Sequence, residues 1–228
     1  METNMFEWPT ATPIDLNTYA RRFWYEHFLT FEIPIVNRTI QIDVTDLLAY
    51  VKQHKHRFAL TLGFVLTRAS NHVPEMRHRI VDDQLVAYNK VIPSYSILSE
   101  EKIFRLCKGV YTDNFAHDHA ENARIVERAA REPDPNVGSP NQGQIFITNN
   151  PWNSFTSIQA PYTRKLASVP VFCIGKMYSN NGRTIAPLGI QTHHSVVDGY
   201  HIGHFIHNME RHLNDPTLLE RPFASTFA

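Results

Sequence analysis

The sequence has only two cysteines, Cys107 and Cys173, in 228 residues. Two cysteines cannot build a disulfide framework and lack metal-ligand spacing, so we predict a protein of the reducing cytoplasm. No charge of one sign is in excess, because 22 Lys and Arg balance 22 Asp and Glu, so we expect neither nucleic acid nor a membrane surface as partner. No apolar run approaches the ~20 residues that span a bilayer. Residues 1–9 lack the positive segment and apolar core of an export signal.

The remaining composition is typical of a globular protein, with 43% apolar and 19% charged residues. A chain of this length buries roughly 70% of its unfolded surface, which is enough for a stable core. The clearest loop, residues 132–143, contains three of the 14 prolines but is too short to mark a domain boundary. We therefore expect one domain over residues 1–228.

Hydrophobic periodicity divides the chain into alternating helices and strands. Apolar spacing of three and four predicts helices over residues 15–31, with Asp15 as N-cap, and over 46–56, 59–70, 114–131 and 199–214. Strand patterns cover two short runs within 33–44, which fit either a strand pair or one bulged strand, and residues 85–88, 95–98, 144–148, 169–178 and 184–194. Asn181-Gly182 between the last two runs is a strong hairpin signal. This order predicts an α/β two-layer sandwich, with a mixed β-sheet covered by helices mainly on one face.

The segment from Gln191 to His201 carries the chemistry. Neighbouring side chains on a strand point to opposite faces, so His193 and His194 cannot both address one centre. Gly199 permits a tight turn into the last helix, which places Asp198 close to the histidine that ends the strand. An imidazole titrates near physiological pH, and beside a rigid acidic turn it is suited to act as a general base. We take His194 as that base.

A buried Asp198 requires a cationic partner from elsewhere, since no Lys or Arg lies between Arg183 and Arg211. Arg21, beside the apolar stripe of the first helix, is a candidate; the alternative is a surface charge whose stem covers the core. A second alternative concerns the helix bearing His201, His204 and His207, whose spacing resembles a metal site. The HExxH pattern and a nearby cysteine pair are both missing, so we predict no metal.

The pattern HHxxxDGxH over residues 193–201 resembles the signature of the chloramphenicol acetyltransferases, within the wider group of coenzyme A-dependent acyltransferases. Residues 19–22, 150–157 and 175–191 resemble the same family in the same order. The resemblance implies that family's fold over nearly the whole chain. It also implies a homotrimer, in which the base comes from one subunit and much of the acceptor pocket from its neighbour.

The resemblance assigns a role to each matching residue. His194 corresponds to the general base that deprotonates a substrate hydroxyl, and Asp198 with Arg21 to the ion pair that holds it. Thr148 stands where a serine usually stabilises the oxyanion; a threonine donates the same hydrogen bond with a more restricted rotamer. Arg57 and Lys176 correspond to basic contacts of the coenzyme's phosphate, unless they are ordinary surface charges.

Departures from the family concern the acceptor pocket. Phe28 and Phe104 fit its aromatic walls, but Ile158 and Ala160 replace larger side chains and Cys173 replaces a threonine. Each change removes ring area, bulk or a polar contact, so chloramphenicol binds more weakly or the acceptor differs. Met177 likewise stands where a tyrosine often stacks near the coenzyme.

The resemblance implies an acetyl-CoA-dependent O-acetyltransferase that acts on chloramphenicol and confers resistance, with acetyl-CoA as co-substrate. One alternative is the core of a dihydrolipoyl acyltransferase, although that family has Asp-His-Arg where this chain has residues 192–194. Another is a non-catalytic protein that sequesters an apolar ligand or a metal.

Overall fold

The computed structural model describes residues 7–226, which contain a seven-stranded mixed sheet in the order β2-β10-β8-β7-β5-β6, with β9 paired to β10. Strand β7 runs parallel to β5 and β8, and the other neighbours are antiparallel. The strands are β2 (Ile35–Asp43), β5 (Ile92–Leu98), β6 (Phe104–Lys108), β7 (Gln144–Asn149), β8 (Val171–Ile174), β9 (Tyr178–Asn180) and β10 (Arg183–His193). The predicted mixed sheet is confirmed.

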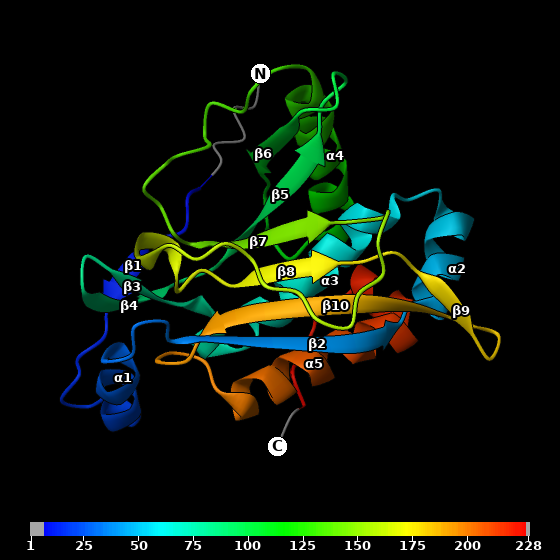
Figure 1. Cartoon of the computed structure of the whole chain (residues 1–228). Coiled ribbons are helices and arrows are strands. Elements are labelled where there is room, and N and C mark those ends of the chain that lie inside the picture. The colour runs from blue at the N-terminus through cyan, green and yellow to red at the C-terminus, as the bar shows by residue number, and fades with distance from the viewer. Residues whose placement is uncertain (1–6, 227–228) are drawn as a thin grey trace.

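Helices cover one face of this sheet, as Figure 1 shows. They are α2 (Thr45–His54), α3 (Phe58–Asn71), α4 (Phe115–Arg131) and α5 (Gly199–Asn214). The short helix α1 (Arg22–Leu29) stands apart from them near the start of α5 (Figure 1). A three-stranded sheet of β1 (Ala11–Pro13), β4 (Gln84–Tyr88) and β3 (His78–Val81) lies outside the main sheet, and short 3-10 turns occupy Pro74–Arg77, Arg164–Leu166 and Pro216–Glu220.

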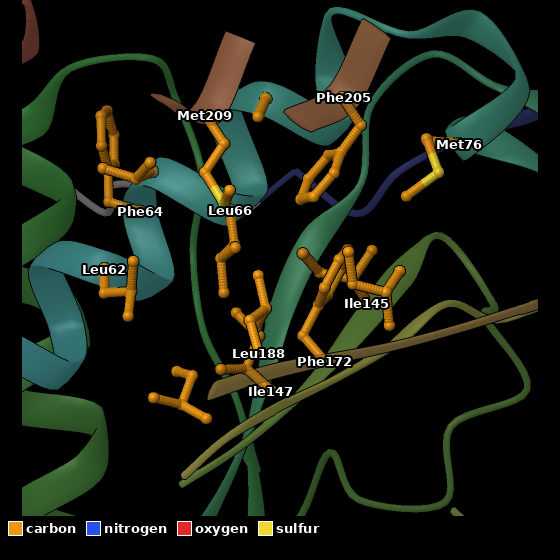
Figure 2. Close-up of a cluster of buried hydrophobic side chains, with 14 of the residues drawn as sticks. Leu62, Phe64, Leu66, Met76, Ile145, Ile147, Phe172, Leu188, Phe205 and Met209 are labelled. Atoms are coloured by element: carbon orange, nitrogen blue, oxygen red, sulfur yellow. The ribbon is translucent and has the colours of Figure 1, made fainter. Parts of the chain in front are cut away.

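The core lies between the sheet and its helices. In Figure 2, Leu66 of α3 and the α5 residues Phe205 and Met209 point toward Ile147 and Phe172 of the sheet, and all five are buried. The rings of Phe172 and Phe205 stack with centroids 5.0 Å apart. Because side chains alternate along a strand, the residues on either side of Ile147 face away from the helices.

The sheet face opposite the helices is crossed by residues 150–167 (Figure 1). The amide of Ala160 donates to Oε1 of Gln191 on β10, which anchors the crossing segment to the sheet. Ile158 lies directly over Gly189, where a Cβ would come within 2.3 Å of its Cγ2. Glycine is therefore needed at this position for the segment to approach the sheet.

The N-terminal helix differs from its prediction. Asp15 does not cap a helix, because its carboxylate accepts from the amide of Asn17 and forms a local turn. Helix α1 begins only at Arg22 and ends at Leu29. The two short runs predicted within 33–44 form one strand, β2, since its pairing with β10 is continuous from Ile35 to Asp43.

The strand predicted over residues 169–178 is also wrong in extent. It is two strands, β8 and β9, because the amide of Lys176 bonds to the carbonyl of Asn153 and leaves the sheet. The hairpin that follows is confirmed, with Asn181 and Gly182 at positive φ of 47° and 76°. The remaining predicted elements are present within a few residues, while β1, β3 and β6 carried too short a pattern to be predicted.

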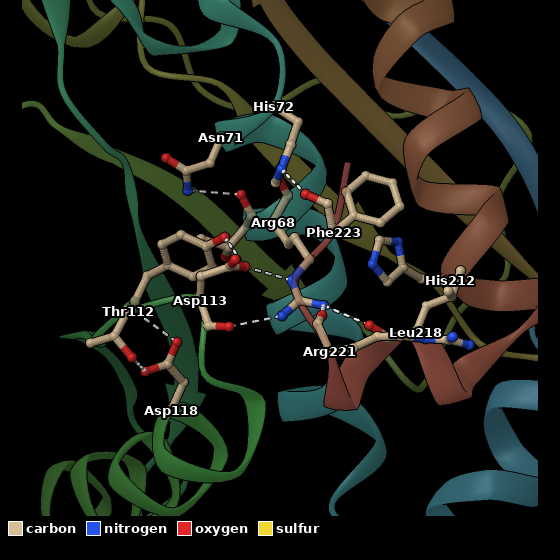
Figure 3. Close-up of polar contacts among 12 residues, drawn as sticks. Arg68, Asn71, His72, Thr112, Asp113, Asp118, His212, Leu218, Arg221 and Phe223 are labelled. Carbon is tan, nitrogen blue, oxygen red and sulfur yellow. Dashed lines mark hydrogen bonds and ion pairs between the residues drawn. The ribbon is translucent and has the colours of Figure 1, made fainter. Parts of the chain in front are cut away.

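A buried arginine fixes α3 to the C-terminal part of the chain (Figure 3). The Arg68 side chain is fully buried, and its Nε donates to Asp113 Oδ1 at 2.7 Å. Its Nη1 donates to the carbonyl of Leu218, while His72 Nε2 lies 2.9 Å from the carbonyl of Phe223. This network lies on the helical side of the sheet.

Residues 7–226 include no helix that is long and apolar enough to cross a membrane. Residues 1–6, which belong to the segment predicted not to be an export signal, lie outside the described part of the chain.

Candidate active site

A tight turn joins the end of β10 to the start of α5 and carries the two histidines. The amides of Val196 and Val197 donate to the carbonyl of His193, which closes the turn. Asp198 then caps α5, because its Oδ1 accepts from the amides of Tyr200 and His201. The cap satisfies otherwise unpaired helix donors and fixes the point at which the turn becomes helix.

His194 lies half-buried at this turn with a defined ring orientation. Its Nδ1 is 3.2 Å from the carbonyl oxygen of Val197, and its ring stacks on Phe28 with centroids 4.0 Å apart. A carbonyl only accepts hydrogen bonds, so the neutral ring carries its proton on Nδ1 and presents the lone pair of Nε2. This arrangement suits a general base.

His193 has different surroundings. Its side chain is buried, and its Nδ1 accepts from the amide of Ser195. Burial lowers the pKa of His193 to about 4, because an imidazolium is poorly solvated inside the protein. His193 is therefore a neutral structural residue near pH 7.

Arg21, at the start of α1, reaches the same turn. Its Nη2 lies 3.0 Å from Asp198 Oδ2, and its Nη1 donates to the carbonyl of Val196 at 2.6 Å. Both side chains are partly buried. The guanidinium thus links the cap of α5 to the backbone beside His194, although Arg21 and Asp198 lie far apart in the sequence.

Two further residues extend this ion pair inward. His201 Nδ1 is 2.9 Å from Asp198 Oδ1, and His201 Nε2 is 3.6 Å from a carboxylate oxygen of Glu75. Burial lowers the pKa of His201, while Glu75 and Asp198 act to raise it. Glu75 lies in the turn Pro74–Arg77, far from the histidine motif, and no sequence pattern predicts its place in the site.

Thr148 lies near the end of β7, on the sheet face opposite the helices. It lines a cavity of about 440 Å³ together with Phe104 and Ala160. The walls are mainly apolar, and the polar groups are hydroxyls and an amide: Ser94, Ser96, Thr148, Tyr162, Thr163 and Gln191. Such a cavity is suited to an apolar molecule with a few hydrogen-bonding groups.

Within one chain, the residues of the predicted site form two groups. His194, Phe28, Arg21 and Asp198 gather at the turn before α5, whereas the cavity lined by Thr148 is not lined by His194. The two groups come from opposite parts of the sheet, since β10 ends at His193 and β7 ends at Asn149.

The family whose model matches this chain bears the description "Chloramphenicol acetyltransferase", and the match covers residues 10–210. The chain belongs to this family. A chloramphenicol acetyltransferase of Klebsiella sp. is 29% identical over 214 residues, covering 90% of this chain and 94% of the relative. That of Bacillus pumilus is 32% identical over 197 residues, covering 85% and 89%. The predicted resemblance is confirmed.

Solved structures agree on the fold. A chloramphenicol acetyltransferase structure superposes with a TM-score of 0.83 at 24% identity, covering 90% of this chain and all of the other. The dihydrolipoamide acetyltransferase of Azotobacter vinelandii has a TM-score of 0.61 at 16% identity, covering 86% of this chain and 88% of the other. At these identities the likeness establishes the α/β fold of the acyltransferases alone. The chain is an enzyme of the chloramphenicol acetyltransferase family.

Four of the five predicted acceptor residues lie on the cavity side of the sheet. Phe104 and Ala160 line the cavity itself. Cys173 is the β8 neighbour of Thr148, and Ile158 lies over Gly189 beside it. Burial raises the pKa of Cys173 to about 11, so its thiol stays protonated near pH 7 and is a poor nucleophile.

The two predicted coenzyme contacts, Arg57 and Lys176, lie on different elements, and within residues 7–226 no hydrogen bond or ion pair joins them. Arg57, at the start of α3, forms an ion pair with Glu127 of α4. Lys176 is exposed between β8 and β9. Both are accessible to a phosphate.

The helix histidines have separate surroundings. His204 Nε2 contacts Ser225 and His207 Nε2 contacts Thr226, while His201 faces Asp198 and Glu75. In the part of the chain that the structure describes, no group of three or more potential ligands is arranged to hold a metal ion.

Proposed function

We propose that this enzyme transfers the acetyl group of acetyl-CoA to a hydroxyl of chloramphenicol. The observation that carries the proposal is the His194 ring, whose Nδ1 faces the Val197 carbonyl and whose Nε2 is thereby left as a base. Family membership supports the reaction class, and the largely apolar cavity beside Thr148 supports a drug-like acceptor. We place the reaction in the cytoplasm, consistent with two free, buried cysteines.

In the proposed reaction, His194 Nε2 removes the proton of the acceptor hydroxyl as its oxygen attacks the thioester carbonyl carbon. The carbonyl oxygen becomes an oxyanion, to which the Thr148 hydroxyl donates a hydrogen bond. Collapse of this tetrahedral intermediate breaks the carbon–sulfur bond. The departing thiolate takes the proton back from His194, giving free coenzyme A and the acetyl ester.

Arg21 and Asp198 act in this scheme as positioning residues. The guanidinium holds the Val196 carbonyl and the carboxylate that caps α5. The next carbonyl, that of Val197, is the one that orients His194. The ion pair therefore fixes the backbone on which the tautomer of the base depends.

We further propose a homotrimer, in which His194 of one subunit faces the Thr148 cavity of the next. Large apolar side chains are exposed beside both groups, including Phe23 at 67% and Phe104 at 65%. Trp24 and Phe31 beside His194, and Ile103 beside the cavity, are likewise exposed. Apolar patches of this kind mark protein interfaces, and one cyclic contact would cover both patches and complete the site.

Acetyl-CoA would approach from the end of the sheet where Lys176 leaves β8. Lys176 is free to contact a phosphate, and Arg57 would share its guanidinium between a phosphate and Glu127. The acceptor would lie between Phe104 and Ala160 of one subunit and Phe28 of its neighbour, with Ile158 and Cys173 shaping the wall.

The test is release of free thiol when purified protein is mixed with acetyl-CoA and chloramphenicol. We expect turnover by the unchanged enzyme, and loss by at least ~10³-fold in His194→Ala without loss of folded structure. Thiol release with another alcohol but not with chloramphenicol would overturn the acceptor. An unaffected His194→Ala variant would overturn the mechanism.

A subunit-mixing experiment tests the shared site. His194→Ala and Thr148→Ala chains, each nearly inactive alone, are co-expressed in equal amounts with different tags, and mixed oligomers are isolated. In a cyclic trimer that contains both chains, one of the three boundaries joins an intact His194 to an intact Thr148, so activity returns to about one third of that of the unchanged enzyme. Mixed oligomers without activity would show that both residues act within one chain.

A further inference from the structure

Ser96, a residue with no role in the sequence motifs, lies against Thr148. Strands β5 and β7 run parallel with Tyr95 opposite Ile147, so the next residue of each strand lies on the cavity face. The Ser96 Oγ lies 2.5 Å from the Thr148 Oγ1. Both residues line the same cavity and are partly buried.

We propose that Ser96 is a positioning residue for the oxyanion donor: it donates its hydroxyl hydrogen to Thr148 and leaves the Thr148 hydrogen directed at the substrate. This inference rests on the proposed function, because it needs Thr148 to donate to the oxyanion. The structure supports it in three ways, through distance, exclusivity and geometry.

The contact is short and exclusive. A distance of 2.5 Å is at the lower end for hydroxyl–hydroxyl hydrogen bonds. Within the described residues, Ser96 is the one hydrogen-bond partner of the Thr148 hydroxyl, and Thr148 that of Ser96. Each hydroxyl has a single hydrogen, so when Ser96 donates to Thr148, the hydrogen of Thr148 is left for the cavity.

The arrangement also strengthens the donor. A hydroxyl that accepts one hydrogen bond becomes a better donor of the next, because the chain of dipoles is polarised in one direction. The negative charge of the forming oxyanion favours hydrogen bonds that point toward it. Both bonds then run in one direction, from Ser96 to Thr148 and from Thr148 to the oxyanion. The methyl group of Thr148 restricts χ1, and the bond to Ser96 selects the rotamer that presents Oγ1 to the cavity.

Ser94 provides a matched comparison. It is on the same strand and the same face, lines the same cavity, and lies opposite Phe146 instead of Thr148. Loss of the Ser94 hydroxyl changes the cavity wall without removing a partner of Thr148. Any effect of Ser94→Ala should therefore be independent of Thr148.

The test is a double-mutant cycle measured by thiol release with acetyl-CoA and chloramphenicol. We expect Ser96→Ala to lower kcat by about tenfold, the loss of one hydrogen bond, and to change each KM by less than about twofold. Ser96→Thr keeps the hydroxyl and should restore kcat to within about threefold. In a Thr148→Ala background, Ser96→Ala should lower kcat by less than about twofold more, whereas the effect of Ser94→Ala should be the same in both backgrounds.

Each other outcome has a definite meaning. Full kcat in Ser96→Ala, or an equal loss in the Thr148→Ala background, would overturn the role of Ser96 while leaving acetyl transfer intact. Full kcat in Thr148→Ala would overturn the oxyanion role and, with it, that of Ser96. No turnover by the unchanged enzyme would overturn the proposed function and this inference together.

Discussion

The ion pair between Arg21 and Asp198 offers the sharpest test of how the proposed base, His194, is held in place. Asp198 has two separable duties, since Oδ1 caps α5 and Oδ2 pairs with Arg21. Asp198→Asn keeps the cap, because Asn caps helices as well as Asp does, and removes the charge. Arg21→Ala removes the charge partner and leaves the cap intact.

The expected magnitudes follow from exposure. The Arg21 Nη2 and Asp198 Oδ2 atoms are 3.0 Å apart, and the two side chains are 17% and 34% exposed. The pair is therefore neither fully buried nor free in water and contributes about 1–2 kcal/mol to stability. Asp198→Asn should lower the free energy of unfolding by this amount. Asp198→Ala should lose about 1 kcal/mol more, the cost of an empty cap.

Catalysis should respond more strongly than stability. Without its partner, Arg21 no longer fixes the Val196 carbonyl, and the turn that orients His194 through Val197 loosens. We expect kcat to fall by ~10- to 100-fold in both Asp198→Asn and Arg21→Ala, with KM nearly unchanged, and the double variant to lose little more. Steady-state thiol-release kinetics and urea unfolding at fixed protein concentration measure the two effects. Asp198→Asn with full kcat would refute the reasoning.

Three further predictions concern stability. Burial lowers the pKa of His193 to about 4, below the ~6.5 of an unfolded histidine, so the unfolded chain binds this proton first and stability falls as pH drops from about 6.5 toward 4. His193→Asn should flatten that pH dependence of urea unfolding by up to about one proton; an unchanged slope would contradict it. Arg68→Ala removes a fully buried side chain together with its hydrogen bonds to Asp113 and Leu218 and should lower stability by about 2–4 kcal/mol by the same assay; a loss below about 1 kcal/mol would count against the network. Gly189→Ala forces Ile158 away and should cost about 1–3 kcal/mol, which added Ile158→Ala largely restores; failure of that rescue would contradict the contact.

Local patterns predicted the elements whose determinants are local. The helix over residues 199–214 begins and ends where it was predicted to. Its determinants are all local, because the cap Asp198, the next residue Gly199 and the apolar spacing lie within one short segment. The same is true of the hairpin at Asn181 and Gly182, whose positive φ angles only a few residue types adopt readily.

Local sequence patterns could not predict contacts between segments that are distant in the sequence. The break between β8 and β9 depends on Asn153, whose carbonyl takes the amide of Lys176 away from the sheet. Asp15 resembles a helix cap in sequence, yet its side chain serves a turn. The pairing of Arg21 with Asp198 was one of two open alternatives, and only the fold decides it.

The candidate site follows the same division. The turn around His194 is local and was recognisable, whereas Glu75 and Ser96 belong to elements without a motif of their own. Ser96 contacts Thr148, 52 positions further along the chain, only because β5 and β7 pair in parallel in one register. The alternation of apolar and polar residues shows which face of each strand is buried, but it does not show which residue of β5 lies opposite which residue of β7.

His194 and the Thr148 cavity lie apart within one chain, and this separation is the reason why the proposed site needs a second subunit. The proposed base and the proposed oxyanion donor lie on opposite parts of one sheet, and the side chains packed against that sheet (Figure 2) form a core that resists bending, so the two residues cannot approach each other within one chain. A neighbouring subunit can supply the second group without any such movement. The exposed rings of Phe23 and Phe104 would then be buried in the contact that completes the site. Polar substitution of either ring, such as Phe23→Asp, should therefore abolish assembly and activity together, whereas an active monomer would refute the shared site.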